Sequence, residues 1–454
     1  MGFAGKLRST STTKRKDLSL GAPERRGETL PPPESSGRTK DPTPLPERSA
    51  RDFSPPFRLP ASLFLLLPAF FFLLSCGPAP SGTPSQATVY SGSAYALSGP
   101  TALVSVGGVP WYANTTGNSL VGLVPQSYDG PSGYTPVTLS NPLTSSSYGS
   151  TPYDLSAPVA MAVDLSGNLW VASQKNNSLV SLESTDTNSN PLYYISLQAG
   201  YLANLDTPSG IAADPSGKIW VANQGNNTLL VLATVTCNYS CPTTDYAPYG
   251  YDGTHYSPTL YCLSGSSCTQ MGAGCVLASP SAIASDSNGN IWVINSSPVS
   301  LTEIVGGNVS SCRSFTASEL SLDNPVALAP DISGNLAIVN QGTKTAADSG
   351  SVVYLPSGCT PGSCTPVVLT GSSQGIDQPV SASFAQNGDL WVAEAGNSSA
   401  TDMPSGCLSG GACQPIVYSG SAYPFGTPTS ILAIGKTIWV LGANALVAIT
   451  PSGP

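Results

Sequence analysis

The segment from Thr207 to Leu232, with the sequence TPSGIAADPSGKIWVANQGNNTLLVL, recurs in seven similar copies along most of this chain. Each copy opens on a proline and closes 11 or 12 residues later on a tryptophan, which one copy replaces with an alanine. The copies cover 100–111, 158–170, 208–220, 280–292, 325–337, 379–391 and 428–439. Because successive copies begin 45 to 72 residues apart, each copy marks one supersecondary unit of a repeat architecture.

Each copy reads as two β-strands joined by a tight turn. Apolar residues alternate on both sides of Asp214–Gly217, which is the two-residue period of a strand. In that turn the aspartate side chain can accept a hydrogen bond from the backbone N–H two residues further on, and the proline fixes φ at the second position. The glycine adopts the unusual backbone conformation of the fourth position. The same turn recurs at 164–167, 286–289 and 331–334, while 385–388 keeps the glycine but not the aspartate. A third strand follows over Thr228–Leu232, and we expect a fourth before the next proline.

Seven such units predict an all-β fold, a seven-bladed β-propeller of four-stranded blades over residues 87–454, with a Cys-rich insertion at about 233–278. The heptapeptides 89–95 and 417–423 are identical, and each precedes a repeat proline, so both are expected to be fourth strands. The last copy stops without a fourth strand of its own. We therefore expect the N-terminal strand to complete the last blade, which would remove open sheet edges. The tryptophans are expected to form the core between blades.

The run from Pro208 to Leu232 resembles the NHL-repeat pattern P-x-G-I-A-x-D-x-x-G-x-I-x-V-A-D-x-x-N-x-R-I-x-V, and the resemblance extends from about residue 88 to 449. The chain departs from the pattern at Asn223 and Thr228, where the family has aspartate and arginine. The chain also resembles, more loosely, the streptogramin lyase-like propellers, which are understood to use a histidine and a divalent cation. The one histidine, His255, lies in no repeat position and is expected in a surface loop, so that activity does not carry over.

Residues 1–75 are predicted to be a leader and a lipoprotein signal peptide. The first 60 residues are basic and Pro-rich without apolar periodicity, which is typical of a disordered segment. Residues 59–74 form an apolar run shorter than the ~20 residues of a spanning helix, as in a signal-peptide h-region. Leu73–Gly77 then resembles the bacterial lipobox, which implies a lipid on Cys76 and a tether over 76–86; the alternative is ordinary secretion with cleavage near Ser75. The sequence thus predicts a lipid-anchored protein of the bacterial cell envelope, facing the periplasm or the cell exterior.

Charge separates the leader from the rest of the chain. Of 17 Lys and Arg, 12 precede Cys76, and of 26 Asp and Glu, 7 do, which leaves 5 cationic against 19 acidic residues. A net charge of −14 would repel phosphates, so nucleic acid is excluded as a partner. We expect a monomer that contacts a membrane only through its lipid.

Ten cysteines remain once Cys76 is set aside, an even number suited to an oxidising compartment. Proximity in the sequence favours five local disulfides, although it does not exclude other pairings. The expected pairs are Cys237 with Cys241, Cys262 with Cys268, Cys275 with Cys312, Cys359 with Cys364, and Cys407 with Cys413. Zinc is disfavoured because the spacings differ from those of zinc ribbons.

In a propeller, the loop that enters each first strand and the loop between the second and third strands emerge on the same face. The predicted candidate binding face carries carboxylates and amides on these loops: Asp206, Asp323, Asp377, Gln174, Asn223, Gln224, Asn340, Gln341 and Glu394. Such oxygens would suit Ca²⁺ or Mg²⁺, whereas amides with nearby tyrosines suit sugars or peptide backbones. The alternative to a binding face is that each aspartate only accepts hydrogen bonds within its own turn. No catalytic residue, bound metal or cofactor is predicted.

Two functions follow from this face. The first is a lipid-anchored extracytoplasmic binding or scaffold protein for a protein, peptide or glycan. The alternative is a metal-dependent hydrolase or lyase of the lactonase or streptogramin lyase-like propeller type, with acidic residues at the channel mouth. The sequence names no substrate for either.

Overall fold

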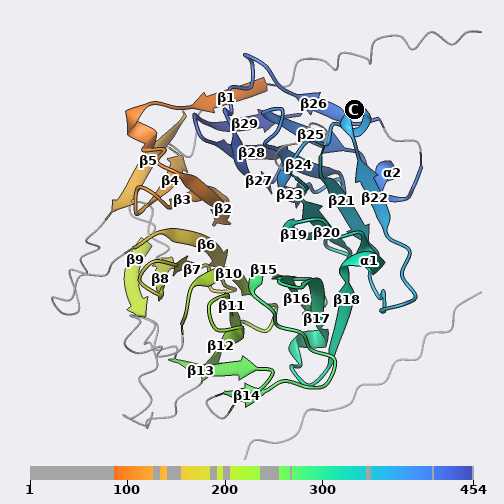
Figure 1. The fold of residues 1–454 in the computed structure, drawn as a ribbon. Helices are drawn as coiled ribbons and strands as arrows, with labels where there is room; N and C mark the ends of the chain where they lie inside the picture. The colour runs from red at the N-terminus through yellow and green to blue at the C-terminus, as the bar shows by residue number, and fades with distance from the viewer. Residues whose placement is uncertain are drawn as a thin grey trace, which may run out of the picture. The chain divides into compact units, whose positions relative to one another are not determined.

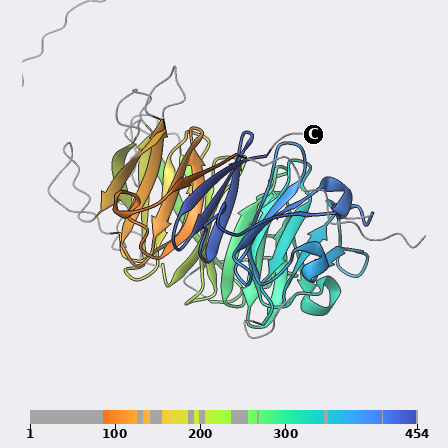
Figure 2. The same cartoon turned by 90° about the horizontal axis from the view of Figure 1, so that it is seen from above.

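The computed structural model describes residues 86–125, 133–140, 155–184, 192–197, 205–235, 255–265, 268–343, 349–411 and 414–451. They form seven antiparallel sheets arranged in a ring, so the predicted seven-bladed β-propeller is confirmed (Figure 1). Seen from above, the sheets stand side by side around the ring (Figure 2). Helical turns are few and short: η1 (Ser93–Tyr95), η2 (Val305–Gly307), α1 (Ala317–Leu320), η3 (Ser372–Gln374) and α2 (Ser405–Leu408).

Blades 1 to 6 take their strands in chain order from the inside outward. Blade 1 contains β2 (Pro100–Val106), β3 (Val109–Asn114), β4 (Ser119–Pro125) and β5 (Tyr134–Ser140), and blade 2 contains β6 (Pro158–Val163), β7 (Leu169–Ser173), β8 (Ser178–Ser184) and β9 (Leu192–Leu197). Blade 3 contains β10 (Pro208–Ala213), β11 (Ile219–Asn223), β12 (Thr228–Val235), β13 (His255–Cys262) and β14 (Thr269–Gln270). Blade 4 contains β15 (Pro280–Ser285), β16 (Ile291–Ser296), β17 (Val299–Ile304) and β18 (Cys312–Thr316).

The last three blades complete the ring. Blade 5 contains β19 (Pro325–Pro330), β20 (Leu336–Asn340), β21 (Ser351–Leu355) and β22 (Val367–Thr370), and blade 6 contains β23 (Pro379–Phe384), β24 (Leu390–Glu394), β25 (Ser399–Met403) and β26 (Ile416–Tyr418). Blade 7 contains β27 (Pro428–Ile434), β28 (Thr437–Gly442), β29 (Leu446–Thr450) and, outermost, β1 (Gln86–Tyr90).

The ring closes as predicted, by pairing the two ends of the propeller. β1 lies antiparallel to β29, with Thr88 opposite Ala448 and Tyr90 opposite Leu446. Tyr90 then stacks on Trp439 of the same blade at 5.6 Å between ring centroids. The N-terminal strand therefore supplies the fourth strand that the last repeat lacks.

Every repeat proline is followed by a register shift between the first two strands of its blade. The shift leaves one extra residue after the proline, as in a β-bulge, and a bulge re-aims a side chain. In blade 3 this residue is Ser209, whose hydroxyl donates to the carbonyl of Pro280 in blade 4 at 2.6 Å. Thr101 of blade 1 reaches Pro158 of blade 2 in the same way at 3.4 Å. The bulge thus links neighbouring inner strands.

The hydrophobic core lies between blades rather than at one centre. Trp111 packs with Leu169 and Val171 of the next blade, and Trp220 packs with Ile291 and Val293. The same arrangement recurs at the other interfaces, and all six tryptophans are at most 4% exposed. Packing between blades is therefore the role of the repeated tryptophan.

The predicted insertion at 233–278 needs a correction. Residues 255–262 form β13, the fourth strand of blade 3, and β14 adds a short parallel fifth strand. His255, expected in a surface loop, instead begins β13. Sequence spacing concealed this strand because the link from β12 to it is long.

Three expected disulfides are present among the described residues: Cys262–Cys268, Cys275–Cys312 and Cys359–Cys364. Cys407 is also disulfide-bonded, while its expected partner Cys413 lies outside the described residues, as do Cys237, Cys241 and Cys76. These bonds indicate an extracytoplasmic protein. Within the described part of the chain, no helix is long and apolar enough to cross a membrane.

Candidate functional site

The two kinds of loop expected on one face meet in every blade. In blade 3 the backbone N–H of Gln224, just after β11, donates to the carbonyl of Thr207, just before Pro208, at 3.2 Å. The equivalent bond is present in all seven blades. A second bond joins the backbone N–H of Gly225 to the carbonyl of Asp206 at 3.0 Å, and four other blades repeat it at the same positions. We call the surface built from these paired loops the loop face.

The residue before each repeat proline adopts an uncommon backbone conformation on this face. In six blades its φ is positive: Gly99, Ala157, Thr207, Ser279, Asn324 and Gln378, with φ between 50° and 64°. Steric contact with a following proline ordinarily favours extended backbone, and left-handed backbone at a non-Gly residue costs on the order of 1–3 kcal/mol. The backbone hydrogen bonds between the paired loops hold this conformation.

Six of the predicted face residues remain accessible. Asp323 is exposed, whereas Asp206, Asp377, Gln174, Gln224 and Gln341 are partly exposed. Asp206 lies directly over Gly225, where an added Cβ would come 2.5 Å from the carboxyl carbon, and Asp377 lies in the same way over Gly396 at 2.4 Å. Glycine in these loops therefore makes room for a carboxylate of the incoming loop.

Three other predicted face residues are fully buried, which corrects the sequence interpretation. Asn223, Asn340 and Glu394 end their second strands with 0% exposure. Asn340 Nδ2 donates to the carbonyl of Ser321 at 3.0 Å and to the hydroxyl of Ser351 at 2.9 Å. The last residue of the second strand therefore connects the incoming loop to the blade through buried hydrogen bonds. The apolar pattern did not predict its burial, because the strands extend one residue further than that pattern.

Glu394 occupies this position in blade 6. Its Oε2 accepts from the backbone N–H of Asp377 at 2.9 Å, while Oε1 is buried without a hydrogen-bond partner among the described residues. Burial raises the pKa of Glu394 from 4.5 to about 8, an effect that the Asp377 backbone bond opposes and the Asp377 charge reinforces. A neutral carboxylic acid therefore stands where blades 1, 3, 4 and 5 have asparagine.

A second buried acid of blade 6, Asp402 on β25, escaped the sequence analysis. It is the register partner of Trp391 and is 8% exposed. Burial and then the nearby Asp389 raise its pKa from 3.8 to about 7. The sequence pattern could not reveal this acid, because it shows only in the pairing of strands. Blade 6 has Ala385 where other blades carry the turn aspartate, and an acid lies on the third strand instead.

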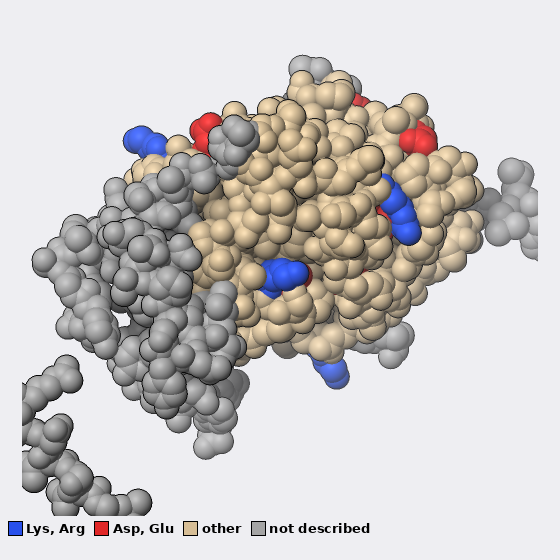
Figure 3. Space-filling view, turned by 90° about the horizontal axis from the view of Figure 1, so that it is seen from below, with Lys and Arg blue, Asp and Glu red and all other residues tan. Residues whose placement is uncertain are grey.

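The walls of the central channel carry no ionisable side chain. The seven inner strands, β2, β6, β10, β15, β19, β23 and β27, consist only of Ala, Gly, Ile, Leu, Met, Phe, Pro, Ser, Thr and Val. The surface seen in Figure 3 also shows few charged residues where the chain is described. Among the described residues, no three His, Cys, Asp or Glu side chains gather closely enough to hold a metal ion. The described residues therefore do not form a site for the divalent cation that the streptogramin lyase-like resemblance implies.

The loop face also contains a cleft where blade 7 meets blade 1. It has a volume of about 650 Å³ and is bordered by the turn before β2, the loop between β3 and β4, the end of β5 and the loop between β28 and β29. Its size lies within the range of about 300–1,000 Å³ of small-molecule sites. Sequence reasoning missed it because its lining residues come from two blades that are far apart in the sequence.

The fold and its loop face define a seven-bladed β-propeller with NHL-type repeats. The NHL repeat family matches residues 205–232 of the chain, so the predicted resemblance is confirmed for this copy. A comparison with curated proteins finds no match.

Solved structures share the fold at low identity. A streptogramin B lyase has 14% identity and a TM-score of 0.53, over 80% of this chain and 97% of that one. A catalytically inactive virginiamycin B lyase from Staphylococcus aureus, solved with quinupristin, has 16% identity and a TM-score of 0.52, over 81% and 99%. Hydrazine synthase of Kuenenia stuttgartiensis has 13% identity and a TM-score of 0.52, over 79% and 97%. These likenesses concern the fold alone.

Proposed function

We propose that this protein is an extracytoplasmic binding protein, held to a membrane by a lipid on Cys76, whose loop face docks a protein, peptide or glycan. The observation that supports it most is the paired construction of the loops. Two backbone bonds per loop pair fix the face before any ligand arrives, and preorganisation lowers the entropy cost of binding. The partly exposed amides of Gln174, Gln224 and Gln341 would offer both donors and acceptors to a neutral polar partner.

The alternative prediction, a metal-dependent hydrolase or lyase, requires carboxylates or histidines that converge at the channel mouth. Its best candidates would be Asp206, Asp323 and Asp377. They belong to three different blades, and no cluster of metal ligands forms among the described residues. We therefore keep the binding function as the proposal.

The test compares two sets of substitutions in the full chain. Gln174, Gln224 and Gln341 are replaced together with alanine on the loop face. The matched control replaces Ser287, Ser333 and Gln386, which are exposed turn residues at the opposite ends of the strands. Ligands retained on the wild-type protein after chemical cross-linking in its native envelope are then quantified by mass spectrometry.

We expect the first variant to lose a specific ligand at least tenfold while the control keeps it. Equal retention by both variants and the wild type would contradict a role for the loop face. A calcium and magnesium titration by calorimetry, with Asp206, Asp323 and Asp377 changed together to Asn, addresses the alternative. Cation binding that disappears in this variant would favour the metal-dependent function instead.

A further inference from the structure

The identical heptapeptides 89–95 and 417–423 occupy equivalent places in neighbouring blades, and the first of them borders the cleft. The first runs from β1 into the turn before β2, and the second runs from β26 into the turn before β27. After the second copy, Phe425 fills the space with 0% exposure and stacks on Tyr423 at 6.1 Å. After the first copy the equivalent residue is Leu97, and the cleft is open. The chain thus contains a filled and an open version of one structure.

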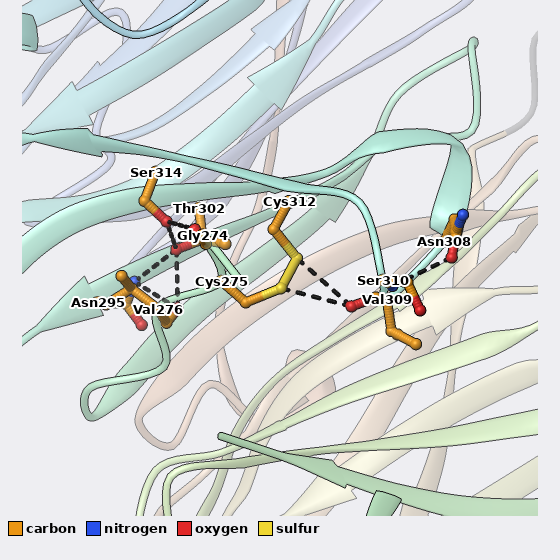
Figure 4. The surroundings of a disulfide bond; sticks show 10 residues. All are labelled: Gly274, Cys275, Val276, Asn295, Thr302, Asn308, Val309, Ser310, Cys312 and Ser314. Carbon is orange, nitrogen blue, oxygen red and sulfur yellow. Dashed lines mark hydrogen bonds between the residues drawn. A yellow bond between two sulfur atoms is a disulfide. The ribbon is translucent and has the colours of Figure 1, made fainter. Parts of the chain in front are cut away.

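Other blades close the equivalent space with their own hydroxyl groups. In blade 4, Ser314 donates to the carbonyl of Gly274 at 2.7 Å and Thr302 donates to the carbonyl of Val276 at 2.8 Å, beside the Cys275–Cys312 disulfide (Figure 4). In blade 6 the incoming loop closes directly on Thr401, which donates to the carbonyl of Gly375 at 2.9 Å.

Blade 1 has a hydroxyl in the same position without that bond. Thr138 is the register partner of Val121, as Ser314 is of Thr302, so Thr138 is the equivalent of Ser314. Its hydroxyl makes no hydrogen bond to any described residue. The side chains of Ser93, Ser98 and Ser140 are likewise without a hydrogen bond in the described part of the chain, and all three line the cleft. Four hydroxyl-bearing residues whose side chains make no hydrogen bond to a described residue therefore line one open space.

We propose that this cleft between blades 7 and 1 binds a neutral saccharide. None of the described residues that line it is ionisable, so an ionic ligand would lose its hydration without gaining a counter-charge from them. Hydroxyl groups both donate and accept, which matches the hydroxyls of a sugar. Leu97, Ala96 and Ala443 add an apolar part of the wall suited to the C–H face of a sugar ring. This inference rests on the proposed binding function and adds to the loop face a separate site, for a neutral saccharide, between blades 7 and 1.

The test uses the full chain in detergent micelles and calorimetric titration with maltotriose, cellotriose, mannotriose and chitotriose. Glucuronic acid and a triserine peptide are titrated as anionic and peptide probes. Leu97→Phe copies the residue that fills the second version and is expected to abolish binding of the neutral trisaccharide. Thr138→Val and Ser93→Ala are expected to weaken it about fivefold to tenfold each, the loss of one neutral hydrogen bond. Ser421→Ala, at the residue equivalent to Ser93 in the second heptapeptide, is the matched control and should bind like the wild type.

Several outcomes would overturn this inference, and each has a different consequence for the cleft and for the proposed binding function. Saccharide binding that survives Leu97→Phe would place the site elsewhere, yet the protein would remain a binding protein. Binding of triserine or glucuronic acid alone, lost in Leu97→Phe, would refute the ligand class and keep the cleft. Binding of none of these probes refutes the saccharide site, whereas the cross-linking comparison of the loop face still decides the proposed function.

Discussion

The indole Nε1 of Trp220 donates a hydrogen bond of 2.9 Å to Oδ2 of Asp214, the first residue of the turn that opens its strand. Oδ1 of the same carboxylate accepts from the backbone of Ser216 at 2.8 Å and of Lys218 at 3.0 Å. The pairs Asp164–Trp170 and Asp286–Trp292 repeat the bond at 2.9 Å. The turn aspartate and the tryptophan are therefore one structural unit, in which a buried carboxylate orders the turn and satisfies a buried indole.

Replacement of Asp214 by alanine should destabilise the protein by about 2–4 kcal/mol, because it leaves the Trp220 N–H buried without a partner and removes the turn bonds. Asp331→Ala is the matched control, since blade 5 has Ala337 in place of tryptophan and no indole to satisfy. Its cost should be smaller by about 1–2 kcal/mol. Urea unfolding followed by fluorescence measures both. Equal losses in the two variants would show that the indole bond contributes nothing.

Blades 5 and 6 each lack one member of this unit and have a side chain of the missing kind on the paired third strand. In blade 5 the aromatic ring is that of Tyr354, which is the register partner of Ala337. The hydroxyl of Tyr354 lies 3.5 Å from Oδ2 of Asp331. In blade 6 the acid is Asp402, opposite Trp391. Both exchanges occur across paired strands, so the register of the sheet must be known before they can be seen.

The sequence predicted what is encoded locally and repeatedly. The strands, the turn at Asp214–Gly217 and the closure by β1 all follow from spacing and from the duplicated heptapeptide. The candidate site was predicted only in part, because burial of Asn223, Asn340 and Glu394 depends on how far each strand extends. The cleft bordered by Leu97 depends on which side chain fills a space between blades, and no periodic pattern encodes that.

Ring closure makes Tyr90 a sensitive position. Its ring is 7% exposed and contacts Trp439, Tyr95 and Tyr134. Tyr90→Ala should lower the free energy of unfolding by about 3–5 kcal/mol, the usual cost of removing a buried aromatic side chain. Val89→Ala, at a side chain 41% exposed on the same strand, should change it by less than about 1 kcal/mol. Differential scanning calorimetry would separate the two, and similar melting temperatures would argue against β1 as the closing strand.

The disulfides should contribute unequally to stability. Cys275 and Cys312 are 37 residues apart, whereas Cys359 and Cys364 are 5 apart. By loop-closure entropy, loss of the first bond should cost about 4 kcal/mol and loss of the second about 2 kcal/mol. The first bond also fixes the turn before β15 to the outer strand of blade 4. Double serine variants compared by chemical denaturation test this order, and a larger loss for Cys359 and Cys364 would reverse it.

Glu394 should make the protein less stable as pH rises. Its pKa in the folded state is about 8, well above its ordinary 4.5, so the folded protein holds a proton that the unfolded chain releases. The stabilisation is complete below about pH 4.5 and is lost as pH rises toward 8, because the unfolded state then binds fewer protons. Asp402, with a pKa of about 7 in the folded state, adds a further loss of stability as pH rises, over a lower pH range.

Glu394→Gln keeps the shape of the protonated acid and supplies the amide that the asparagines of sister blades provide. At pH 8 this variant should be more stable than the wild type by on the order of 2–4 kcal/mol, since each pKa unit corresponds to about 1.4 kcal/mol. Near pH 4.5 the two proteins should be nearly equal. Glu319→Gln is the control, because Glu319 is exposed and hydrogen bonds from Thr316 lower its pKa, so its removal should not give the alkaline gain. Urea midpoints measured from pH 4.5 to 8.5 decide the matter, and parallel curves for the wild type and Glu394→Gln would mean that Glu394 is ionised in the folded protein.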